Sequence, residues 1–125
     1  MNNNLSLVFK ELRKRGFLAR QNFKCCGNCA GYALTNEAVV KVGAGKTVRG
    51  SVFYHRQDRQ HFEHSGKLMI RYGSLDSNEL GVIGEDTTKI GQEVVAVFET
   101  HGIKVQWNGD SSQCIEVFPN EHRAQ

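Results

Sequence analysis

Residues 87–109 read TTKIGQEVVAVFETHGIKVQWNG, and this stretch decides the fold class because a helix signal is followed at once by a strand signal. Its first part repeats apolar residues at the spacing of one buried helix face, at Ile90, Val94, Val97 and Phe98. Asp86 or Thr87 is suited to begin that helix and Gly102 to end it. Apolar residues at every second position then predict a strand over 103–107. The stretch therefore predicts helix and strand within one domain.

The same two signals recur along the rest of the chain. Upstream they predict helices over 4–15 and 26–41 and strands over 17–23, 51–55 and 67–72, and downstream they predict a last strand over 114–118. Asn4 is a suitable N-cap for the first helix. Asn108-Gly109 is a turn signal, so the last two strands form a β-hairpin. Without the first helix and the final strand, the order is strand, helix, strand, strand, helix, strand, which is the split βαβ pattern of ferredoxin-like folds.

The expected architecture is a single α+β domain over residues 1–125. Its sheet is expected to be antiparallel, with the helices on one face, an additional N-terminal helix and a C-terminal β-hairpin. At 125 residues the chain is large enough to form a core without disulfides. No segment approaches the roughly 20 apolar residues that span a bilayer, and the start lacks the layout of a signal peptide. We therefore expect a cytoplasmic protein without a membrane partner.

The net charge of +3 is unevenly distributed along the chain. Residues 1–72 carry 13 Lys and Arg against 4 Asp and Glu, whereas residues 73–125 carry 3 against 9. A basic surface attracts acidic partners, which include proteins and nucleic acids. We interpret the cationic residues at the end of the first helix and on the next strand as candidate contacts: Arg13, Lys14, Arg15 and Arg20.

Three of the four cysteines fall within five residues, at Cys25, Cys26 and Cys29. Cys26 and Cys29 form a C-x-x-C pair, the separation at which two thiolates on a turn can share one metal ion or one disulfide. The turn is expected where a strand leads into a helix, and exposed N–H groups there lower a thiol pKa. Three interpretations stay open: a zinc site, a redox pair, or cysteines that only pack as small apolar residues.

A zinc site needs about four ligands, and a second C-x-x-C is missing from the sequence. The remaining candidates are Cys114 and histidines. His61 and His64 are three residues apart on an expected helical turn that Asp58 is placed to cap, so they could supply a pair of imidazole ligands. His55, at the end of a strand near Asp58, is a candidate base or ligand. We therefore assign His55 and Asp58 to a candidate binding site and His61 and His64 to the candidate metal site.

Several segments taken together resemble a known family. They are residues 16–29, which include Asn22-Phe23-Lys24-Cys25-Cys26-Gly27-Asn28-Cys29, then 52–58, 72–73 and 91–95, and His101-Gly102-Ile103-Lys104-Val105-Gln106-Trp107-Asn108-Gly109. This set is similar to an uncharacterised bacterial domain family of unknown function. The resemblance covers most of the chain and implies that these segments belong together, but it implies no activity, cofactor or fold.

The sequence lacks a nucleophile-elbow, a His-Glu-x-x-His and a dinucleotide-binding motif, so the corresponding enzyme classes have no support. Our first hypothesis is a non-enzymatic module that binds a protein or another acidic partner through its basic first half. Nucleic acid is the second choice of partner, because the aromatic residues lie at core spacing and are not expected to stack on bases. The alternative is a thiol-dependent redox enzyme that uses the Cys26-x-x-Cys29 pair.

Overall fold

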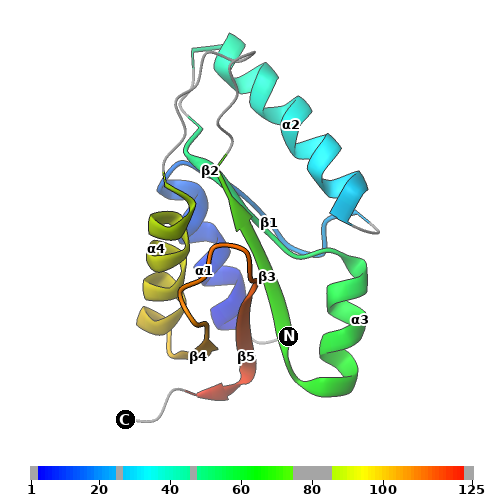
Figure 1. Cartoon of the computed structure of the whole chain (residues 1–125), viewed down its shortest axis with the longest axis vertical. Coiled ribbons are helices and arrows are strands. Elements are labelled where there is room, and N and C mark those ends of the chain that lie inside the picture. The colour runs from blue at the N-terminus through cyan, green and yellow to red at the C-terminus, as the bar shows by residue number, and fades with distance from the viewer. Residues whose placement is uncertain (1–2, 25–26, 46–47, 75–85, 123–125) are drawn as a thin grey trace.

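The computed structural model describes residues 3–24, 27–45, 48–74 and 86–122; the side chains at 3, 27–32, 35 and 120–122 lie outside this description. It contains four helices and five strands in the described residues (Figure 1). The helices are α1 (Asn3–Lys14), α2 (Gly27–Gly43), α3 (Arg56–Ser65) and α4 (Thr87–Thr100). The strands are β1 (Phe17–Arg20), β2 (Gly50–Phe53), β3 (Leu68–Gly73), β4 (Ile103–Gln106) and β5 (Ile115–His122). The predicted α+β class is confirmed.

The five strands form one mixed sheet in the order β1-β2-β3-β5-β4. β1 and β2 are parallel, and the other neighbouring pairs are antiparallel. β3 pairs with β5 through residues 68–70 and with β2 through residues 71–73, so it joins the two ends of the sheet. β4 and β5 form the expected C-terminal hairpin.

The prediction of an antiparallel sheet with a split βαβ order is wrong for the first unit. The split order needs another strand between the two parallel strands, whereas β1 and β2 are direct neighbours with Phe17 opposite Gly50 and Arg20 opposite Phe53. Residues 21–49 provide the crossover that any parallel pair needs, and the split order would need it as well. The difference is the place of β3, which pairs antiparallel with the side of β2 away from β1 and so leaves β1 and β2 in direct contact. The expected succession of elements is present, but the pairing differs.

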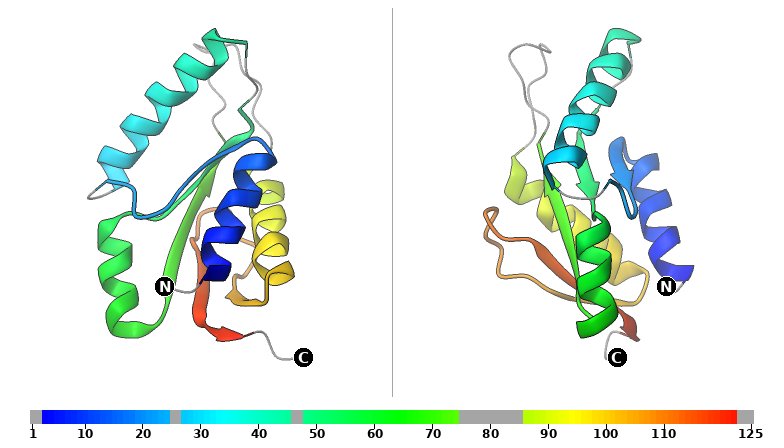
Figure 2. Two further views of the ribbon diagram at one scale, coloured as in Figure 1. Left: turned by 180° about the vertical axis from the view of Figure 1, so that it is seen from behind. Right: turned by 90° about the vertical axis from the view of Figure 1, so that its right-hand side faces the viewer.

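The helices cover both faces of the sheet, which corrects the expectation of a single covered face. Side chains alternate between the two faces of a strand. Phe17 and Ala19 of β1 belong to the main core together with residues of α1 and α4, whereas Leu18 packs with Leu34 and Ala38 of α2. α2 therefore lies on the face opposite α1 and α4 (Figure 2).

The helix boundaries follow capping chemistry, and two of the predicted caps differ. α1 begins at Asn3, and the Asn4 side chain instead donates to the carbonyl oxygen of His101 at 3.0 Å. Asp58 lies inside α3, whose N-cap is His55. Asp86 caps α4 as expected, since its carboxylate accepts from the amides at the helix start.

Candidate functional site

The β1-α2-β2 unit places two loops at the carboxyl ends of its parallel strands, where α/β units commonly bind ligands. The N–H of Phe23 donates to the Tyr54 carbonyl oxygen at 2.9 Å, and the N–H of Arg56 donates to the Lys24 carbonyl oxygen at 3.0 Å. The segment that enters the cysteine cluster is thereby tied to the segment that enters α3. This proximity brings His55 to the same end of the sheet as the cysteine-rich segment.

The backbone of this loop is held in an unusual conformation. Asn22 and Lys24 have φ values of 48° and 64°, in the left-handed region that favours glycine. Asparagine tolerates that region better than lysine does. Such conformations cost free energy and persist where surrounding contacts determine them. The two bonds between the loops supply such contacts on either side of Lys24.

His55 and Asp58 form a reciprocal capping box at the start of α3. The N–H of Asp58 donates to Nδ1 of His55 at 3.3 Å, and the N–H of His55 donates to Oδ2 of Asp58 at 3.2 Å. Because Nδ1 accepts, the proton of the neutral imidazole is on Nε2, which lies 3.3 Å from Oδ2 of Asp58. Asp58 was predicted to be the N-cap. In a capping box the N-cap residue supplies one acceptor and the carboxylate lies three residues later, so His55 is the N-cap and Asp58 is the third residue of the helix.

Asp58 has a second partner that the sequence did not indicate. Nε and Nη2 of Arg71, on β3, donate to its two carboxylate oxygens at 2.9 and 3.1 Å. This bidentate contact raises the Arg71 pKa, with burial opposing it. Burial is also the main cause that lowers the His55 pKa; the Asp58 charge opposes this and the Arg71 charge adds to it. His55, Asp58 and Arg71 thus form one polar cluster that joins α3 to β3.

The structure describes only part of the predicted metal site, which consists of three cysteines and two histidines. Cys25 and Cys26 lie outside the described residues, and Cys29 falls in the first turn of α2. His61 and His64 are exposed on the later half of α3, and at 1.5 Å per residue they lie about 8 and 12 Å along the axis from Arg56. Within the described part of the chain no group of three or more His, Cys, Asp and Glu could hold a metal ion.

Cys114 precedes β5 and is a half-buried free thiol. It lines a small hollow of about 170 Å³ together with Arg71. Burial raises the Cys114 pKa, and this outweighs the opposite effect of the Arg71 charge. A thiol in that environment is a poor nucleophile at neutral pH.

Two of the predicted cationic contact residues converge on one backbone atom. Nη1 of Arg13 and Nη1 of Arg20 donate to the carbonyl oxygen of Ala19 on β1, at 3.1 and 3.0 Å. Arg20 also pairs with Glu37 of α2, with 2.7 Å between Nη2 and Oε1. β1 is an outer strand of the sheet, so these guanidinium groups cover its free edge.

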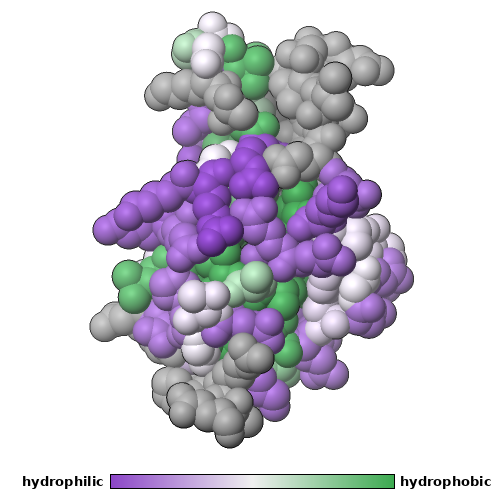
Figure 3. All heavy atoms as spheres, turned by 90° about the vertical axis from the view of Figure 1, so that its left-hand side faces the viewer, coloured by the Kyte–Doolittle hydropathy of each residue, from purple (hydrophilic) through white to green (hydrophobic). Residues whose placement is uncertain are grey.

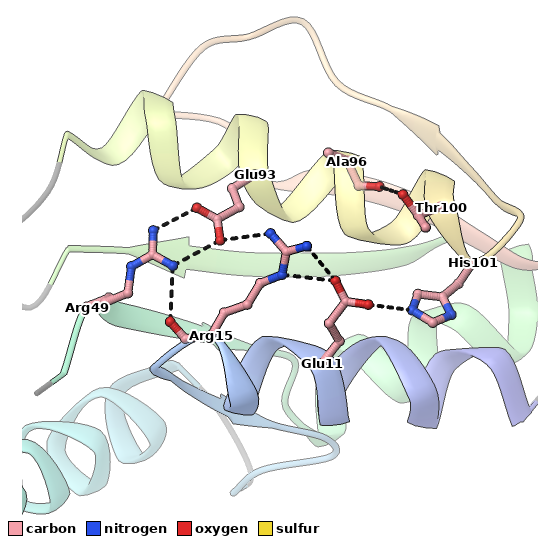
Figure 4. A network of polar contacts seen from close by, with 7 residues as sticks. All are labelled: Glu11, Arg15, Arg49, Glu93, Ala96, Thr100 and His101. Atoms are coloured by element: carbon pink, nitrogen blue, oxygen red, sulfur yellow. Dashed lines mark hydrogen bonds and ion pairs between the residues drawn. The ribbon is translucent and has the colours of Figure 1, made fainter. Parts of the chain in front are cut away.

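The third predicted cation, Arg15, belongs to a network of ion pairs between α1, α4 and the start of β2 (Figure 4). Arg15 binds Glu11 one turn earlier and Glu93 of α4, and Arg49 donates to both carboxylate oxygens of Glu93 at 2.9 and 2.7 Å. Hydrogen bonds from Arg49 and Arg15 lower the Glu93 pKa. The network lies on the α4 side of the molecule, where hydrophilic residues cover much of the surface (Figure 3).

These contacts divide the predicted cationic set. Arg15 and Arg20 have acidic partners within the chain, while Lys14 is exposed at the end of α1. Three residues of these contacts were not predicted from the sequence: Arg49, Arg71 and Glu93. Arg71 and Asp58 are 13 residues apart along the chain, and Arg49 and Glu93 are 44 residues apart. Local sequence patterns carry no signal for pairs at that separation.

The fold and these contacts define a small α+β domain with a mixed five-stranded sheet. The chain belongs to the family described as a domain of unknown function, DUF6891, whose model matches residues 1–124. The resemblance to a domain family of unknown function is thereby confirmed at the level of the family. No curated protein and no solved structure matches the chain. No helix among the described residues is long and apolar enough to span a bilayer.

Proposed function

We propose that this protein is a non-enzymatic binding module that holds an acidic protein surface at the end of α1 and the edge of β1. The observation that carries the proposal is the convergence of Arg13 and Arg20 on the Ala19 carbonyl oxygen. One carbonyl dipole cannot neutralise two guanidinium charges, and Glu37 balances only Arg20. A carboxylate from outside the chain would find an unbalanced positive charge there.

The neighbouring residues of α1 extend this positive surface. Lys10 precedes Arg13 by three residues and Lys14 by four, so the three side chains share one face of the helix. All three residues are exposed. We name this set, with Arg20, the basic cluster. The basic cluster contains Lys10 in place of Arg15 of the predicted set, because Arg15 belongs to the internal ion-pair network.

A protein partner is favoured over nucleic acid by the position of the aromatic residues. Phe9, Phe17 and Phe53 are at most 9% exposed, so they are not available to stack on bases. Binding of single strands without sequence preference usually combines a basic groove with such stacking platforms. The basic cluster has the charge but not the aromatic surface of such a site.

The proposal is tested by fluorescence anisotropy with a labelled poly-glutamate peptide as the probe, over a series of salt concentrations. K10E/K14E is expected to weaken binding by about tenfold or more, because it reverses two charges of the cluster. R13Q is expected to weaken binding less. Binding to the unchanged protein should fall steeply with salt, since exposed charges are screened within about 8 Å at physiological ionic strength.

The matched control is K89E/K104E, which changes the net charge by the same amount on α4 and β4. It is expected to retain most of the affinity. Equal losses in the two double variants would show that only net charge matters and would refute a defined site. A labelled single-stranded oligonucleotide that binds more tightly than the peptide would assign the surface to nucleic acid instead.

A further inference from the structure

The loop between β4 and β5 contains the one asparagine of the chain that a glycine follows, Asn108 before Gly109. Both residues are exposed, and Gly109 has a φ of 84°. The loop is the orange segment that joins the two strands in Figure 1. This pair was predicted as a turn signal, and its contacts in the folded chain also give it a chemical property.

An Asn-Gly pair can react with its own peptide bond. The glycine nitrogen loses its proton to solvent and attacks Cγ of the asparagine side chain. A C–N bond forms, and the side-chain nitrogen takes a proton from water and leaves as ammonia. Water then opens the resulting succinimide ring at one of its two carbonyl carbons, which gives aspartate or isoaspartate. The reaction is favoured where the nitrogen is accessible and the amide carbon is held close to it.

The nucleophilic nitrogen is free to react in this loop. Among the described residues, the N–H of Gly109 has no hydrogen-bond partner, although the N–H groups of Asp110, Ser112 and Gln113 are all bonded. A Cβ atom built at Gly109 would meet nothing within 4 Å, so the peptide lies in open space. The glycine also places no side chain against the ring that has to close.

The side-chain amide of Asn108 is held and polarised by the next residue but one. The N–H of Asp110 donates to Oδ1 of Asn108 at 2.9 Å, which is an Asx turn. This bond folds the amide forward along the chain, towards the peptide of Gly109. It also stabilises the negative charge that develops on Oδ1 during the attack, as a donor of an oxyanion hole does. We propose that Asn108 is a site of spontaneous deamidation and isoaspartate formation in the folded protein.

Isoaspartate at this position changes the surroundings of Trp107, which is the only tryptophan of the chain. The carbonyl oxygen of Asp110 accepts from Nε1 of Trp107 at 3.3 Å and from the hydroxyl of Tyr72 at 3.2 Å. Isoaspartate adds one carbon to the main chain between Trp107 and Asp110. Because Tyr72 belongs to β3 and Trp107 directly follows β4, the rings stay with the sheet while the loop is displaced. The indole N–H is thereby released to solvent.

The experiment incubates the purified full chain and follows each asparagine by peptide mass mapping, with protein isoaspartate methyltransferase as the reagent that detects isoaspartate. Asn108 is expected to convert to aspartate and isoaspartate, and to do so faster at higher pH because the attacking nitrogen must lose a proton. N108Q should slow the reaction by about tenfold or more, since its longer side chain has to close a larger ring. Asn36, exposed on α2 before Glu37, is the internal control and should stay unchanged.

Tryptophan fluorescence measures the effect on the loop. The emission of the incubated protein should shift to longer wavelength as Trp107 becomes more exposed. N108D is the matched control, because it adds the same negative charge without lengthening the main chain. Freshly purified N108D should therefore keep the emission of the unchanged protein.

The results that would overturn the inference are equally defined. If Asn108 stays intact in the folded protein but reacts in urea, the loop protects the amide and the inference is wrong. It is also wrong if Asn108 stays intact under both conditions, or if Asn36 reacts as fast. Isoaspartate that leaves the Trp107 emission unchanged would refute the displacement of the loop.

Discussion

Gly91 shows how one missing side chain permits a close contact between α4 and the strands. A Cβ atom at this position would lie 2.7 Å from Cη2 of Trp107 and 3.0 Å from Cε2 of Tyr72. Those two rings meet edge to face with their centroids 5.8 Å apart. The glycine lets the helix approach the aromatic pair directly, although glycine is a poor residue for a helix interior.

We expect G91A to destabilise the protein. Alanine would gain about 1 kcal/mol in helix propensity. The overpacked contact with Trp107 should cost about 1–3 kcal/mol, so the net loss should be about 1 kcal/mol in the free energy of unfolding. Urea denaturation measures it. G43A is the control, because a Cβ at Gly43 of α2 meets nothing within 4 Å and alanine should be neutral or stabilising there. A stabilised G91A would contradict the close packing.

At the scale of an element, α3 depends on the capping box of His55 and Asp58. H55A removes the acceptor for the amide of Asp58 and should lower the free energy of unfolding by about 1 kcal/mol. H55N keeps an N-cap side chain and should lose less. Chemical denaturation at pH 8 compares the two variants. Equal stability of H55A and the unchanged protein would show that the cap contributes nothing.

The same residue gives stability a pH dependence with a defined sign. Burial lowers the His55 pKa in the folded state, so across the range below about 6.5 the unfolded chain binds more protons than the folded one. Stability should therefore fall as the pH falls through this range, and H55N should weaken that fall. The carboxylates Glu11 and Glu93, whose pKa values are lowered, lose their contribution only at more acidic pH. Parallel pH profiles for H55N and the unchanged protein would contradict the assignment.

At the scale of the whole molecule, the zinc hypothesis predicts a link between metal content and stability. If Cys25, Cys26 and Cys29 bind zinc, protein purified without a metal-binding tag should contain about one equivalent, and a chelator should lower its melting temperature. C26S should lose the metal. C114S, which changes a thiol next to β5, should keep it. Less than about a tenth of an equivalent in the unchanged protein would refute the site and leave the cysteines as packing residues.

The sequence predicted those features that depend on near neighbours along the chain. The helix face of Ile90, Val94, Val97 and Phe98, the Asp86 cap and the final hairpin are local patterns, and the structure has all of them. The parallel pairing of β1 with β2 depends on the path of the chain over residues 21–49, which no local pattern specifies. The face covered by α2 could not be predicted for a related reason, since that helix is apolar on both sides.

The candidate site was predictable to the same limited extent. His55 and Asp58 are three residues apart, so their proximity could be inferred, although not the order of their capping roles. The contacts of Asp58 with Arg71 and of Glu93 with Arg49 join separate elements. Such pairs can be inferred only when the arrangement of the helices and strands in the folded chain is known.

The divided pairing of β3 has a consequence for how the molecule unfolds. Residues 71–73 of this strand pair with β2 and residues 68–70 pair with β5, so all hydrogen bonding between the two parts of the sheet runs through these six residues. Loss of β3 would leave the parallel pair and the hairpin with no hydrogen bonds between their strands, joined only through the packing and ion pairs of α1 and α4. The amide protons of β3 should therefore exchange with solvent only through global unfolding, while those of the outer strands escape earlier by local opening.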